Sequence, residues 1–173
     1  VRRKYGILCG AVGIFLNISE DHISPIEHPD FDDYLESKLR LFSQCKTACV
    51  NLSTDHVERV MAAAKNAPRL LTFGTDASAD LRAYRIRKVG TDTVFNVVCD
   101  RFDQEFVLQM PGLFNVENAL AAIAAAYALD IPVQYMVSGL KRARAKGRME
   151  LYHSKDNKIA VIVDFAHNKL SFE

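Results

Sequence analysis

Short apolar runs alternate with helix-periodic segments near the start of the chain, and this alternation limits the fold more than any other feature. Helical periodicity covers residues 29–42 and 54–66, and Ser53 or Thr54 is the expected cap of the second segment. Runs with the length of buried strands lie at residues 11–16, 47–52 and 69–73. This strand–helix–strand order predicts a parallel sheet covered by helices.

The pattern changes between residues 81 and 110. Three alternating stretches, "LRAYRIRKV", "TVFNVVCD" and "EFVLQM", are separated by "GTD" and "RFDQ" and predict a small antiparallel meander. Apolar residues then recur at helical spacing from Leu113 to Tyr127, and a second helix is expected over about 132–142. A further strand is expected within residues 158–168, where it ends in polar side chains. The predicted fold class is therefore α/β.

Composition excludes several kinds of protein. The 173 residues are 49% hydrophobic and 25% charged, which is typical of about one globular domain. Because 22 Lys and Arg nearly balance 21 Asp and Glu, no overall field favours nucleic acid or an anionic membrane. No apolar run is long enough to span a bilayer. The four cysteines lack CxxC spacing, which favours a reduced, cytoplasmic setting.

Two of the expected strands end in clusters of acid and histidine. "NISEDH" occupies residues 17–22, and "DFAHN" occupies residues 164–168. Ligands of open α/β sheets collect at the carboxyl ends of strands, because the loops there vary while the sheet holds them rigidly. Each cluster alone is equally well explained as a helix cap beside a surface histidine.

Lys38 falls inside the apolar stripe of the helix expected after the first cluster. It lies four residues after Tyr34 and four before Phe42. Two interpretations are open. In one, which periodicity alone favours, the stem packs on the stripe and the ammonium reaches water. In the other, a partly desolvated amine is available for chemistry.

Four motifs in the same order resemble the Mur ligase family. "NISEDHISPIEHPDFDDYLESKLRLF" resembles its Asn, Asp-His and lysine-bearing helix segment, and "MPGLFNVENALAAIAAA" resembles its Asn-x-x-Asn helix. "KGRME" is similar to its interdomain linker, and "VIVDFAHNKLSFE" is similar to the opening of its C-terminal domain. The phenylalanine in "LFN" and the "DFAHN" form are most similar to the UDP-N-acetylmuramoyl-tripeptide synthetase branch. The motifs span nearly the whole chain.

The resemblance implies an ATP-dependent ligase of peptidoglycan precursor synthesis. Such enzymes phosphorylate the carboxylate of a UDP-N-acetylmuramoyl-peptide with ATP, and an amino acid then attacks the acyl phosphate. By resemblance His22 is a ligand of one Mg²⁺ ion, and Lys38 is carbamylated near a second. Carbamylation requires a neutral amine, so this reading expects Lys38 to be buried. Asp21 and Glu20 are expected to support the site, although Glu20 stands where this branch often carries arginine.

The family's ATP site maps onto the helix of the second motif. By resemblance Asn118, and less directly Asn115, contact the adenine, and an amide suits this role because it both donates and accepts hydrogen bonds. Phe114 would pack on the adenine ring. Taken alone, Asn118 is equally well a solvated helix residue.

The remaining ligand contacts map onto the two ends of the chain. Arg148 matches the linker arginine that reaches the ATP phosphates, where a guanidinium can make paired hydrogen bonds. Asp164 matches the acid that contacts the ribose, and His167 lies near it. Arg3 and Lys4 occupy the region that holds the muramoyl substrate in the family. Arg148 is otherwise a linker charge, and Asp164 a helix cap.

One family motif is missing. No GxxxxGK[ST] occurs in the sequence, although the family's central domain cradles the triphosphate with that loop. We therefore expect residues 1–147 to be a partial P-loop-type central domain and residues 148–173 to be the linker and the start of a Rossmann-like C-terminal domain. The partner would be the rest of the ligase chain, and the chain alone is expected to be inactive. The alternatives are a non-catalytic nucleotide-binding or interaction module, and a ligase of the cyanophycin or folylpolyglutamate synthetase type.

Overall fold

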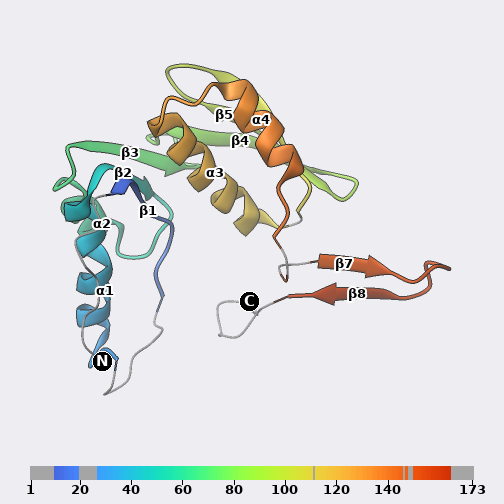
Figure 1. Ribbon diagram of the computed structural model, residues 1–173, viewed down its shortest axis with the longest axis horizontal. Coiled ribbons are helices and arrows are strands. Elements are labelled where there is room, and N and C mark those ends of the chain that lie inside the picture. Colours follow the sequence, from blue (N-terminus) through green and yellow to red (C-terminus); the bar gives the residue numbers. More distant parts are fainter. Residues whose placement is uncertain (1–9, 20–26, 111, 146, 148–149, 165–173) are drawn as a thin grey trace.

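The computed structural model describes residues 10–19, 27–110, 112–145, 147 and 150–164. Figure 1 shows a sheet with helices packed on it and a separate hairpin near the end of the chain. The elements follow in the order β1 (Gly10–Phe15), α1 (Phe31–Leu39), η1 (Arg40–Gln44), β2 (Cys45–Asn51), α2 (Val57–Ala64), β3 (Arg69–Gly74), β4 (Leu81–Val89), β5 (Asp92–Val98), β6 (Asp103–Leu108), α3 (Leu113–Ala128), α4 (Val133–Arg142), β7 (Glu150–His153) and β8 (Ala160–Val163).

One six-stranded sheet runs in the order β1-β2-β3-β4-β5-β6. The first three strands are parallel, and β4, β5 and β6 pair antiparallel, so both the parallel sheet and the meander are confirmed. The meander is not a separate sheet. It joins the parallel part through a short pairing of Phe73 with Leu81 and of Gly74 with Arg82. The connection over residues 75–80 brings the chain back beside β3 before β4 begins.

Helices cover both faces of the parallel part. Ala48 and Val50 of β2 are fully buried in one core, which they share with residues of α1 and α2. Cys49, between them, is fully buried in a second core that contains residues of α3 and α4. Because successive side chains of a strand point to opposite faces, β2 is buried on both sides.

The apolar stripe of α1 is confirmed, but the helix is shorter than predicted. Tyr34, Leu35 and Leu39 are buried on it. The helix begins after Asp30, whose side chain accepts a hydrogen bond from the backbone N–H of Asp33 at 2.8 Å. It then continues as the 3₁₀ turn η1.

The predicted cap of α2 is wrong. The helix begins at Val57, and its N-cap residue is His56, in a left-handed conformation with φ of 53° and no side-chain capping bond. Residues 51–54 form a turn instead. The N–H of Ser53 donates to Asn51 Oδ1 at 3.1 Å, and the N–H of Thr54 donates to the Asn51 carbonyl at 3.3 Å. An asparagine that bonds its own following backbone competes with helix initiation.

The last strands form a hairpin apart from the main sheet. The predicted strand corresponds to β8, and it pairs antiparallel with β7, which the sequence reading did not predict. All four residues of β8 are exposed. The assignment of residues 148–173 to a linker and a further domain stays a prediction. No helix in the described part of the chain is long and apolar enough to cross a membrane.

Asp80 holds the loop between β3 and β4 in place through hydrogen bonds to Thr72. Its Oδ2 accepts hydrogen bonds from the N–H of Thr72 at 2.7 Å and from the Thr72 hydroxyl at 2.8 Å. The Thr72 hydroxyl in turn accepts from the Asp80 N–H at 3.0 Å. Thr72 is buried on β3, so the carboxylate satisfies a backbone donor that water reaches poorly.

We expect Asp80→Ala to lower the free energy of unfolding by about 1–3 kcal/mol, because it leaves a buried donor unpaired. Urea denaturation measures the change. Asp76→Ala is the matched control, because one oxygen of Asp76 accepts from the N–H of Ser78 at 2.8 Å and from its hydroxyl at 2.6 Å. Ser78 is exposed, so water can replace Asp76 and the loss should be much smaller. Equal losses in both variants would contradict this account.

Candidate functional site

The carboxyl ends of β1, β2 and β3 meet at one edge of the sheet, because the three strands are parallel. Helix α3 runs back across them. Its last turn holds Tyr127, whose ring centroid lies 5.7 Å from the guanidinium carbon of Arg69, the first residue of β3. The first turn of α3 therefore lies toward the carboxyl edge. This edge is our candidate site.

The structure brings together the three residues predicted to meet an adenine ring. Asn115 is buried, Asn118 is exposed, and the Asn118 amide donates to Asn115 Oδ1 at 3.3 Å. Phe114 is 53% exposed beside them. Gly112 permits this arrangement, since its φ is 99° and an added Cβ would lie 2.5 Å from the Phe114 ring. An exposed ring next to two amides suits a planar heteroaromatic ligand.

Asn51 and Thr54 belong to the same edge and were missed as functional candidates. Asn51 ends β2 and is 1% exposed, and Thr54 lies in the turn that follows, 5% exposed. The Asn51 Nδ2 and the Thr54 Oγ1 have no hydrogen-bond partner. The available signal was an asparagine at the end of a buried strand, followed by "LSTD".

The expected burial of Lys38 is wrong. Lys38 is exposed, and its Nζ lies 5.1 Å from the centroid of the Tyr34 ring, so the stem follows the stripe while the ammonium reaches water. This is the packing that periodicity alone favoured. Lys38 also lies on the α1 side of the sheet, opposite α3.

Most of the other predicted site residues lie outside the described part of the chain, namely Arg3, Lys4, Glu20, Asp21, His22, Arg148 and His167. Asp164 is described, directly after β8, and it is exposed. Among the described residues, no group of three or more His, Cys, Asp or Glu side chains could hold a metal ion. The magnesium roles of His22 and Lys38 stay predictions.

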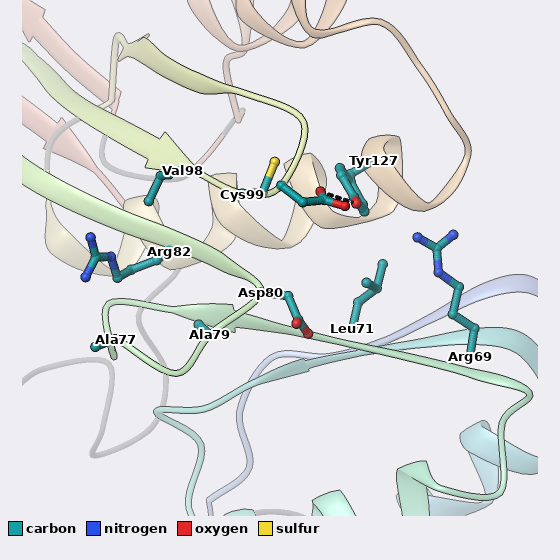
Figure 2. A pocket seen from close by; sticks show the side chains of 10 residues that line it. Arg69, Leu71, Ala77, Ala79, Asp80, Arg82, Val98, Cys99 and Tyr127 are labelled. Atoms are coloured by element: carbon teal, nitrogen blue, oxygen red, sulfur yellow. Dashed lines mark hydrogen bonds between the residues drawn. The ribbon is translucent and has the colours of Figure 1, made fainter.

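Another cavity of about 600 Å³ lies beside β3 and the start of β4 (Figure 2). It is lined by Arg69 at the start of β3, by Asp80 and by Tyr127 at the end of α3, among others. The Tyr127 hydroxyl donates to Asp100 at 2.7 Å. Burial, and then this bond to a carboxylate, raise the pKa of Tyr127. The cavity includes none of the predicted site residues.

The family is decided by a match to the Mur ligase middle domain over residues 2–126, which is most of the chain. This chain belongs to the Mur ligase family. The sequence-based resemblance and the α/β fold are confirmed.

Two curated relatives show how far this Mur ligase similarity extends. The chain is 35% identical to UDP-N-acetylmuramoyl-L-alanyl-D-glutamate–L-lysine ligase of Streptococcus sanguinis, over 98% of this chain and 33% of that protein. It is 34% identical to UDP-N-acetylmuramyl-tripeptide synthetase of Lactobacillus delbrueckii subsp. bulgaricus, over 92% of this chain and 34% of that protein. The chain thus spans about a third of the length of these relatives.

Solved Mur ligase structures share the fold. MurF from Acinetobacter baumannii superposes with a TM-score of 0.82 and 26% identity, over 94% of this chain and 35% of that one. A UDP-N-acetylmuramoyl-L-alanyl-D-glutamate–2,6-diaminopimelate ligase superposes with a TM-score of 0.76 and 28% identity, over 92% of this chain and 33% of that one. Both similarities cover nearly all of this chain and a third of the larger proteins.

Cys49 leads to a prediction about pH. It is fully buried on β2, two residues before Asn51, and burial raises the pKa of its thiol from 9.0 to about 12. The unfolded chain releases this proton near pH 9 while the folded chain keeps it to about pH 12, so rising pH favours unfolding in between. We expect the stability of Cys49→Ala to fall less steeply than wild type over this range in urea denaturation.

The matched control for the thiol is Cys99→Ala, because Cys99 is partly exposed. It should keep the wild-type slope of stability against pH. If Cys49→Ala keeps that slope as well, burial of the Cys49 thiol does not contribute to the alkaline loss of stability.

Proposed function

We propose that this chain is part of an ATP-dependent ligase that joins an amino acid to a UDP-N-acetylmuramoyl-peptide through an acyl phosphate. The observation that carries the proposal is 35% identity over 98% of the chain to a relative named UDP-N-acetylmuramoyl-L-alanyl-D-glutamate–L-lysine ligase. The grouping of Phe114, Asn115 and Asn118 at the carboxyl edge supports it. The setting would be the cytoplasm, where ATP and nucleotide-linked precursors occur.

The residues divide between the nucleotide and the acceptor substrate. Phe114 would stack on the adenine, while Asn118 and Asn115 would bond its edge. Arg148 would bind the phosphates, with Asp164 on the ribose and His167 beside it. Arg3 and Lys4 would hold the muramoyl peptide.

Two residues would serve the metal. His22 would coordinate one Mg²⁺ ion and carbamylated Lys38 would face a second. Bound Mg²⁺ would neutralise the charge of the crowded phosphates. Because Lys38 is exposed in this chain, its activation would depend on groups beyond the described residues. Residues 1–147 would then act within the central domain, and residues 148–173 would lead into the next domain.

The direct test is ligation by a complete ligase polypeptide that contains this chain. Release of ADP that depends on both the muramoyl peptide and an amino acid would support the proposal, and its absence would count against it. The 173-residue chain alone should show no ligation, because it has no GxxxxGK[ST] loop to hold the triphosphate. Ligation by the isolated chain would contradict that expectation.

Phe114→Ala should raise the KM for ATP in the complete ligase by about tenfold or more, since stacking of a base on an aromatic ring contributes about 1–3 kcal/mol. Its melting temperature should change little, because the ring is already 53% exposed. Steady-state kinetics and thermal denaturation measure the two effects. Tyr135→Ala on α4, where the ring is 63% exposed, is the control and should leave the KM unchanged. An unaltered KM in Phe114→Ala would remove Phe114 from the site.

Lys38→Ala should lower kcat in the complete ligase by about 100-fold, near the upper end for groups that support a bound metal. A short carboxylic acid such as acetate should restore part of the activity, because it would supply the missing carboxylate. Mass spectrometry in bicarbonate should also show a carbamate on the wild-type lysine. Lys65→Ala, another exposed lysine, is the control and should keep full activity. Full activity in Lys38→Ala would exclude the carbamate role.

A further inference from the structure

Two buried polar groups in one turn have no partner. In the described part of the chain these are the Asn51 Nδ2 and the Thr54 Oγ1. Their residues are 1% and 5% exposed, so bulk water does not satisfy them. Buried polar atoms are nearly always hydrogen-bonded, and two exceptions within four residues require an explanation.

The orientation of the Asn51 amide follows from its contacts. Its Oδ1 accepts from the Ser53 N–H at 3.1 Å, so the oxygen is fixed and the NH₂ group is the one left over. If the amide were flipped, its NH₂ group would face the Ser53 N–H, and two donors cannot hydrogen-bond to each other. The NH₂ group is therefore a hydrogen-bond donor with a fixed orientation and no acceptor.

The turn lies at the candidate site. Cys49 packs in the core that contains α3, and Asn51 lies two residues further along β2, so its side chain points to the same face. Gly74 ends the neighbouring strand with φ of 154°, and a Cβ there would lie 3.5 Å from Asn51 Oδ1. Gly74 itself adds no side chain beside the amide, and the register partner of Asn51 on that strand is Phe73, which is buried in the core that contains α3. The first turn of α3 lies toward this end of the sheet.

We infer that Asn51 and Thr54 bind an anionic oxygen, from a phosphate or a carboxylate, at the carboxyl edge of the sheet. An amide NH₂ and a hydroxyl are neutral donors, and their bonds to an anionic oxygen are roughly twice as strong as bonds to a neutral one. The 16-residue helix α3 begins without a side-chain capping bond, and the positive end of its dipole favours the same charge. The inference rests on the proposed function, which brings both a triphosphate and a carboxylate to this edge.

Two variants separate binding from packing. Thr54→Val keeps the shape of the side chain and removes the hydroxyl, and Thr54→Ser keeps the hydroxyl. Asn51→Asp keeps the acceptor for Ser53 and replaces the unpaired donor with a carboxylate oxygen that repels an anion. In the complete ligase we expect Thr54→Val and Asn51→Asp to raise one KM about 10- to 100-fold, as loss of a hydrogen bond to a charged group does. Thr54→Ser should stay near wild type.

The two substrates are titrated separately to identify the oxygen. A rise in the KM for ATP identifies a phosphate, and a rise in the KM for the UDP-N-acetylmuramoyl-peptide identifies its carboxylate. The melting temperature of Thr54→Val without ligand should stay level or rise by roughly 2–4 °C, because an unsatisfied hydroxyl is removed. A buried water is the competing occupant. It predicts unchanged KM values in both variants, and that result would overturn the inference.

The two proposals can fail separately. A complete ligase without ligation activity contradicts the proposed function, and the inference then depends on anion binding alone. In that case the melting temperature of this 173-residue chain is measured with ADP, inorganic phosphate and acetate. The inference is supported if these ligands raise the melting temperature of the wild type but not that of Thr54→Val or Asn51→Asp. An equal response in all three proteins, or no response in wild type, overturns it.

Discussion

Burial of the parallel strands on both faces is the constraint on which the rest of the structure depends. β2 places Ala48 and Val50 against α1 and α2, and Cys49 against the core that contains α3. A strand covered in this way offers ligands no face. What is left is the edge where the three parallel strands end and α3 begins. Polar residues gather there, and Asn51, Asn115 and Gly74 all lie at ends of elements.

The same constraint explains which features could be read from the sequence. Buried strands and amphipathic helices leave periodic patterns, so the parallel strands, the meander and the stripe of α1 were predictable. The start of α2 was not, because Asn51 bonds its own backbone and delays the helix to Val57. A local hydrogen bond of this kind leaves no periodic pattern in the sequence. The β7 strand is four residues long, too short for alternation to mark it.

The candidate site was predictable only in part, for a related reason. Asn115 and Asn118 lie one helical turn apart, and the helix brings them together whatever the rest of the chain does. For Lys38, periodicity alone favoured the exposed ammonium that the structure shows, whereas the resemblance to the family led to the wrong expectation of burial. The unpaired Asn51 amide has no mark in the sequence, because its partners depend on how the folded chain surrounds it.

Buried polar groups on the neighbouring strands β3 and β2 are satisfied to different degrees. On β3 the buried N–H and hydroxyl of Thr72 both donate to Asp80, so neither group is left unpaired. On β2 the Asn51 amide is fixed by one bond and left open at its other end. An unpaired buried donor costs roughly 1–3 kcal/mol, a large fraction of the stability of an ordinary domain. A chain that satisfies one such group with a nearby carboxylate has the means to satisfy the other. That it does not do so at the edge where α3 begins is best explained by a ligand that completes the bond.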